Sequence, residues 1–137
     1  MALIALLSAN RVEVVESLEQ MTLPAAEDIS PGAPLRLDTS SGKFTNSNAG
    51  SAAEARTYGI AVGSHVIVAG MPVTAVRRGV LDGFAFVQAY DAPVYVSDTD
   101  GRLADAADTV GVVVGRVIPG AGELAGSAFA KLLLVNL

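Results

Sequence analysis

The sequence predicts a mainly all-β protein: a small β-barrel or sandwich in which a hairpin-plus-strand unit occurs twice. Three observations predict this class. Half of the chain is hydrophobic (51%) but only 5% is aromatic, and the valines in such a core favour strands. Short apolar runs are separated by Gly and Pro at intervals of roughly 8 to 12 residues, which is typical of sandwiches and barrels. The third observation is the internal repeat.

The repeat has two blocks. Ala-Pro-Leu-Arg-Leu at 33–37, followed by a polar turn and Gly42, returns as Ala-Pro-Val-Tyr-Val at 92–96, followed by a polar turn and Gly101. The strand block at 57–63 returns at 109–115. The offset is 59 residues for the hairpin (Ala33 to Ala92) and 52 for the strand block (Thr57 to Thr109). The repeated positions are turn glycines and core apolar residues, so the pattern indicates a duplicated scaffold.

The expected domain division is 1–20 as an N-terminal arm or short helix and 21–137 as the β domain, which is expected to be complete without the arm. Asn10 and Glu13 have the spacing of a helix capping box, although a strand remains an alternative over 8–20. Residues 1–7 are apolar, lack a basic leader segment and are too short to span a membrane. We expect Leu3, Ile4, Leu6 and Leu7 to contact another chain, because exposed apolar side chains need a partner.

The remaining elements follow from local signals. Pro24 ends a strand at 21–23, Ser-Pro-Gly at 30–32 is a turn, and 46–56 is an exposed loop with a helical turn begun by Ser51 and Glu54. The expected strands and hairpins are 35–37 with 43–45, 58–63, two strands around a turn at Gly70 within 66–76, the second hairpin at 92–103, a central strand at 110–118 and a closing strand at 130–135, with a flexible loop at 119–128.

The sequence gives no sign of catalysis, of a cofactor or of a metal site. The chain has no cysteine and one histidine, His65, which lacks a neighbouring acid or nucleophile motif. The Asp-Thr-Asp-Gly segment at 98–101 fails the calcium-loop pattern at its first and twelfth positions and is better explained as a hairpin turn. No phosphate-binding glycine loop or nucleophile elbow is present.

The charge distribution narrows the partner classes. With 14 acidic and 9 basic residues the net charge is −5, and the bases are scattered. A nucleic-acid-binding protein needs a basic stripe, and we therefore expect no nucleic-acid partner. Only Arg77 and Arg78 are adjacent. We expect them to be a solvated pair or to lie at a partner interface, and an anion clamp is the less favoured alternative.

The order and spacing of these motifs resemble the bacteriophage head decoration proteins, also called capsid cement or minor capsid proteins. The resemblance covers residues 20–137. The residues that carry it are Ser-Pro-Gly-Ala-Pro-Leu-Arg-Leu-Asp at 30–38, Gly-Lys-Phe-Thr at 42–45, Tyr-Gly-Ile-Ala-Val-Gly at 58–63, Asp-Ala-Pro-Val-Tyr-Val-Ser-Asp-Thr-Asp-Gly-Arg-Leu at 91–103, the valine-rich segment 110–118 and Lys-Leu-Leu-Leu-Val-Asn-Leu at 131–137.

The resemblance implies a non-enzymatic structural virion protein, made in the bacterial cytoplasm and bound to the outer surface of the assembled capsid. There it would form a homotrimer and bridge neighbouring major capsid protein subunits, with neither nucleic acid nor membrane as a partner. Two alternatives stay open: another β-rich virion component such as a tail or fibre-base module, and a ligand-binding β-barrel or enzyme. A ligand-binding barrel fits the sequence less well, because ligand pockets are usually lined by aromatic side chains and this chain has only seven aromatic residues.

Overall fold

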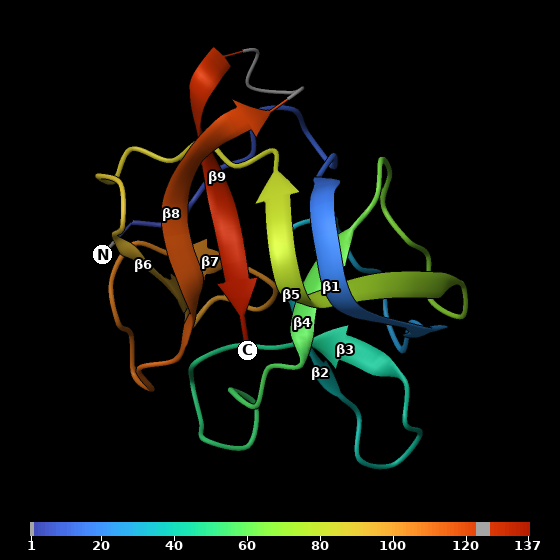
Figure 1. Cartoon of the computed structure of the whole chain (residues 1–137). Helices are drawn as coiled ribbons and strands as arrows, with labels where there is room; N and C mark the ends of the chain where they lie inside the picture. The colour runs from blue at the N-terminus through green and yellow to red at the C-terminus, as the bar shows by residue number, and fades with distance from the viewer. Residues whose placement is uncertain (1, 123–126) are drawn as a thin grey trace.

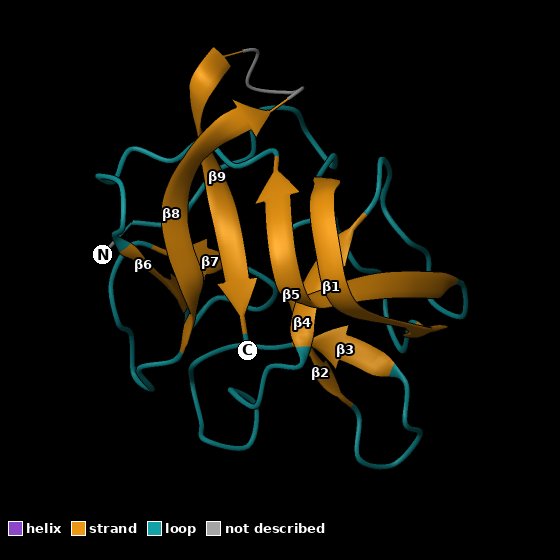
Figure 2. Ribbon diagram, viewed as in Figure 1, coloured by secondary structure: helices purple, strands orange, loops and turns teal. Residues whose placement is uncertain are grey.

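The computed structural model describes residues 2–122 and 127–137. Strands and loops make up this part of the chain, without a helix, and the strands form one curled antiparallel sheet with the shape of a half-barrel (Figure 2). The expected mainly all-β class is confirmed. The strands are β1 (Glu13–Pro24), β2 (Pro34–Leu37), β3 (Phe44–Asn46), β4 (Gly59–Val62), β5 (Pro72–Asp82), β6 (Pro93–Val96), β7 (Leu103–Ala104), β8 (Val113–Gly122) and β9 (Ser127–Asn136).

The sheet order shows that the duplication covers more than a hairpin and one strand. The order is β3-β2-β4-β5-β9-β8-β6-β7, and β1 pairs with β5 outside this path. Read from either end, the path gives the same succession of a short strand, its hairpin partner, a third strand and a long fourth strand. The chain therefore contains two copies of a four-stranded unit, β2–β5 and β6–β9, which meet where β5 pairs with β9 (Figure 1).

The two hairpins share one register. Leu37 pairs with Phe44 in the first unit. Val96 pairs with Leu103 in the second unit, at the predicted offset of 59 residues. Both turns use a glycine with positive φ, Gly42 at 71° and Gly101 at 66°. The predicted equivalence of the two hairpins is confirmed.

The predicted equivalence of the strand blocks is wrong by four residues. Leu35 pairs with Gly59, and the equivalent residue Val94 pairs with Gly115. Gly59 therefore corresponds to Gly115 and not to Gly111, and the offset is 56 residues. Residues 110–112 lie outside the strand, which begins at Val113. Each block contains two glycines four residues apart, Gly59 with Gly63 and Gly111 with Gly115, so the sequence can be aligned in more than one way. The strand pairing shows that Gly115, and not Gly111, lies beside the second hairpin as Gly59 lies beside the first.

The long strands extend the same symmetry to the centre of the sheet. Ile60 pairs with Val76 in the first unit, and Arg116 pairs with Leu134 in the second. This relationship makes Arg78 the equivalent of Asn136, and these two residues pair with each other. A local twofold axis therefore runs between β5 and β9, which form the centre of the sheet in place of the segment expected there, 110–118.

β1 replaces the short helix that was considered for 10–20. It pairs with β5 from Glu13 opposite Asp82 to Pro24 opposite Pro72, with irregularities near Val15 and Leu18. In Figure 1 it lies beside the upper part of β5. The helix interpretation is wrong because the break in alternation at 14–15 is a β-bulge, and the expected domain boundary at residue 20 falls within this strand.

Two other segments differ from the expectations. Residues 119–122 belong to β8 and 127–128 to β9, so the loop expected at 119–128 is wrong for these six residues, and 123–126 lie outside the described residues. The loop at 46–56 is only partly exposed. Its helical turn is confirmed by the bond from the Ala55 N–H to the Ser51 carbonyl. Ala49 is fully buried, and its N–H donates to Ser97 O, so this loop joins the first unit to the second.

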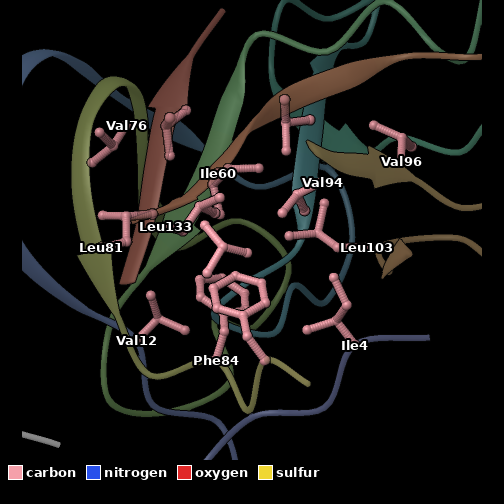
Figure 3. Packing of buried hydrophobic residues seen from close by; sticks show 14 of the residues in the cluster. Ile4, Val12, Ile60, Val76, Leu81, Phe84, Val94, Val96, Leu103 and Leu133 are labelled. Atoms are coloured by element: carbon pink, nitrogen blue, oxygen red, sulfur yellow. The ribbon is translucent and has the colours of Figure 1, made fainter. Parts of the chain in front are cut away.

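The core has a larger cluster centred on the second unit and the sheet centre, and a smaller cluster inside the first unit. Equivalent positions fill both: Leu35 and Val94 are fully buried, as are Phe44 and, to 2% exposure, Leu103. In Figure 3, Ile4, Val12 and Phe84 point toward the same interior as residues of the sheet.

Candidate functional site

The backbone of the N-terminal arm, residues 2–7, is fixed to its own domain. The Ile4 N–H donates to Leu103 O at 3.0 Å, and the Leu7 N–H donates to Gly83 O at 2.7 Å. The Ala85 N–H donates to Ala5 O at 2.8 Å. These bonds place the arm along β7 and along the segment that follows β5.

The four predicted contact residues of the arm divide into two kinds. Ile4 is 7% exposed and belongs to the larger core cluster, while Leu6 is partly buried and packs against it. Leu3 and Leu7 are 39% and 47% exposed. Ile4 thus has an intramolecular role that its sequence context did not reveal, whereas Leu3 and Leu7 present apolar surface to the outside.

The twofold arrangement accounts for one backbone contact of the arm. The Ala26 N–H donates to Phe44 O in the first unit. Because Phe44 and Leu103 are equivalent, the bond from Ile4 to Leu103 O repeats this contact in the second unit. The arm therefore binds the same carbonyl position at β7 that Ala26 binds at β3, but the arm bridges its hairpin antiparallel at Leu3, whereas Ala25 bridges its hairpin in the parallel direction.

Exposed apolar residues near the arm extend its surface. Val87 is 86% exposed and follows the segment that binds Ala5. We call Leu3, Leu7 and Val87 the arm face. Exposed apolar surfaces of this kind commonly mark contact sites for another molecule.

Arg77 and Arg78 lie in β5 and converge on one carboxylate. Arg77 Nη1 lies 3.5 Å from Glu19 Oε1, and Arg78 Nε lies 3.9 Å from Glu19 Oε2. Arg77 also lies over the Tyr58 ring, 5.6 Å from its centroid, and donates to the Leu137 carbonyl. Neither a hydrogen bond, an ion pair nor a strand pairing within the described residues joins this pair to the arm, so the predicted contact residues form two separate groups.

The outer edge of β1 carries exposed apolar residues that the sequence interpretation did not single out. We define the β1 edge by Val14, Val15, Leu18 and Met21, which are 41%, 49%, 74% and 40% exposed. Within the described residues β1 pairs along its length only with β5. Val15 and Leu18 fall at the irregularities of the β1–β5 pairing, and bulges turn side chains away from the regular ladder. The Val14-Val15 pair was the signal that could have revealed them.

A surface cleft of about 680 Å³ brings together residues from β2 and from the loop before β4. We call it the arginine cleft, and its lining residues are Arg36, Leu37, Thr39, Ala53, Arg56, Thr57 and Tyr58. Arg36 and Arg56 are 20 positions apart in the sequence, and spacing gave no indication that they share a site.

The residues considered for catalysis or metal binding are in ordinary surroundings. His65 is exposed, and its Nδ1 lies 3.0 Å from the Val66 carbonyl oxygen. Segment 98–101 forms the predicted hairpin turn, in which the Asp98 carboxylate binds Thr109. Within the described residues, acidic, His and Cys side chains do not gather in threes around a point where a metal ion could sit.

The hairpin turn of the first unit contains a carboxyl group with a lowered pKa. The pKa of Asp38 lies below its usual value of 3.8. The main cause is the Ser41 hydroxyl, which donates to the carboxylate at 2.6 Å, and the Ser40 N–H adds a weaker bond. Both bonds favour the charged form.

Comparisons with protein-family models, with curated proteins and with solved structures found no match for this chain. Within the described residues there is also no helix long and apolar enough to cross a membrane.

Proposed function

We propose that this protein binds the outer surface of an assembled bacteriophage capsid and stabilises the contacts between major capsid protein subunits. The observation that carries the proposal is the arm face. Leu3 and Leu7 keep apolar side chains in solvent on an arm whose backbone is held by hydrogen bonds from Ile4 and Leu7. Val87, two residues after Ala85, which binds the arm, is exposed as well. Exposed apolar side chains of this kind are expected of a surface that a partner covers.

Two further features support a structural role. The chain is a duplicated four-stranded scaffold with a net charge of −5. The motif order resembles capsid cement proteins, which have this kind of β scaffold. In this proposal the protein acts as a homotrimer and without catalysis.

The proposal is tested by adding the purified protein to undecorated shells and measuring its occupancy by cryo-electron microscopy. We expect saturable binding to the outer surface and shells that withstand heating better. Apolar docking predicts that moderate salt changes the occupancy little. Failure to bind shells would contradict the proposal, and binding to tail structures instead would favour another virion component.

A matched pair of variants tests the arm face itself. Leu7→Ser removes an apolar side chain that is 47% exposed, while Val113→Ser removes one that is 46% exposed at the start of β8. We expect Leu7→Ser to lower shell occupancy about tenfold or more, since about 1.4 kcal/mol of lost contact changes affinity tenfold. Val113→Ser should bind like the unmodified protein, and equal losses would contradict docking through the arm face.

A further inference from the structure

The arginine cleft contains two guanidinium groups that form no ion pair within the described residues, although the charge of Arg36 acts on the nearby carboxylate of Asp38 and contributes to lowering its pKa. The ion pairs of the described residues use Arg11, Arg77, Arg78 and Arg116. Neither Arg36 nor Arg56 makes a hydrogen bond or an ion pair there, and the Arg36 Nε is buried without a hydrogen-bond acceptor. Exposed Leu37 and the Tyr58 ring supply apolar surface beside these charges. The cleft is therefore suited to a segment that carries both a carboxylate and apolar side chains.

The β1 strand offers such a segment, because acidic residues alternate in it with the apolar residues of the β1 edge. Glu13 is paired with Arg11, and Glu19 is paired with Arg77 and Arg78. Glu16 is exposed and has neither a hydrogen bond nor an ion pair from its side chain within the described part of the chain. It lies between the exposed residues Val15 and Leu18.

We propose that the arginine cleft of one copy receives the β1 edge of a second copy, with Glu16 bound by Arg36 and Arg56 and with Leu18 against Leu37. The occupant is another molecule, because β1 is paired with β5 from Glu13 to Pro24 and cannot fold into its own cleft. The contact joins two different surfaces, so it repeats from copy to copy and closes into a ring when the rotation permits.

Charge favours this contact over pairing between two β1 edges. Antiparallel β1 strands would bring the acidic residues Glu13, Glu16 and Glu19 of two copies together, and like charges across strands are destabilising. The bulges near Val15 and Leu18 also interrupt the edge that such a pairing needs. The cleft offers opposite charge and requires no continuous ladder.

This inference deepens the proposed function by naming a contact between copies of the protein. It rests on the proposed function only in assuming that copies associate. It is tested on the free protein, without shells, so the two can fail separately. If the protein does not bind shells but its copies still associate through the cleft, only docking through the arm face is contradicted. Loss of the cleft contact with normal shell binding would contradict only this inference.

Disulfide trapping is the direct test, because the chain has no cysteine of its own. A chain carrying both Leu18→Cys and Leu37→Cys is oxidised with glutathione disulfide at micromolar concentration and separated without reductant. We expect covalent dimers and higher species that disappear on reduction. The control chain carries Leu18→Cys and Val113→Cys, both at exposed positions, and should give few of them. Equal yields from the two chains would overturn the proposal.

Charge reversal gives a second, independent measurement. Sedimentation of Arg36→Glu and of Glu16→Arg should show at least tenfold weaker self-association than the unmodified protein, and an equimolar mixture should recover it, because each variant keeps one intact surface. Arg116→Glu is the control of equal charge change, at an exposed arginine outside the cleft, with folding checked by circular dichroism. A monomeric unmodified protein at all concentrations, or equal loss from Arg36→Glu and Arg116→Glu, would overturn the proposal.

Discussion

Gly59 and Gly115 are equivalent residues that approach equivalent carbonyl groups. A Cβ atom added to Gly59 would lie 2.8 Å from Val76 O, and one added to Gly115 would lie 1.8 Å from Leu134 O. Val76 and Leu134 are themselves equivalent in the two units. Each glycine thus allows its strand to approach the long strand of its own unit.

Substitution of Gly115 by alanine should destabilise the protein by about 3 kcal/mol, because the methyl group would overlap backbone that cannot move independently. Gly59→Ala should cost less, since its Cβ contact is longer. Chemical denaturation monitored by circular dichroism measures both. Gly111→Ala is the control, because its Cβ would meet only the Ala107 side chain, at 3.6 Å, and equal effects at 111 and 115 would contradict the corrected alignment of the repeat.

Ile4→Ala should lower the free energy of unfolding by about 3 kcal/mol, as expected for a buried isoleucine. Leu7→Ala should cost less than about 0.5 kcal/mol, because its side chain is largely in solvent. Deletion of residues 2–10 should lower the melting temperature for the same reason as Ile4→Ala. An unchanged melting temperature after the deletion would show that the arm contributes nothing to the stability of the domain.

Asp91 adopts φ of 69° at the position where the first unit has Gly32, with φ of 90°. The Arg116 guanidinium binds its carboxylate at 2.8 Å on the surface. We expect Asp91→Ala to be less stable than Asp91→Gly by about 1 kcal/mol, since glycine takes positive φ without the steric penalty of a Cβ atom. Thermal unfolding of the two variants measures this difference. Because both variants lack the ion pair with Arg116, its loss does not contribute to the difference between them.

The lowered pKa of Asp38 predicts an effect of acid on the first hairpin. A carboxyl group with a lowered pKa in the folded state stabilises it above the unfolded value, and this stabilisation is lost as the pH falls through the folded pKa. The loss should therefore occur below about pH 3.8. Ser41→Ala should raise the pKa of Asp38, because it removes the strongest hydrogen bond. Carbon-13 NMR titration of the carboxyl group measures the shift, with Ser40→Ala as a control that keeps its backbone bond.

The hairpins were predictable from the sequence because each is a local structure. Gly42 and Gly101 mark the turns, and the apolar residues on either side set the register. The strand offset was not predictable, because Gly59 and Gly63 have the same spacing as Gly111 and Gly115. Only the approach of a neighbouring carbonyl distinguishes the glycines, and that neighbour comes from a later part of the chain.

The candidate surfaces were likewise predictable only where they depend on local sequence. The apolar character of Leu3 and Leu7 was evident, and both are exposed. The burial of Ile4 depends on Leu103, and the shared cleft of Arg36 and Arg56 depends on how the loop before β4 returns to β2. Neither relationship leaves a pattern in the local sequence.

The place of the arm has a consequence for how the chain folds during synthesis. Arg102 donates to the Ile4 carbonyl across 98 positions of the sequence, so the arm leaves the ribosome long before the residues that bind it. The first unit has all of its own strands once β5 has emerged, whereas the second unit also binds the arm, which precedes the first unit in the sequence. Such long-range closure slows folding, and we expect the first unit to form early while the arm stays unbound until β7 has been made.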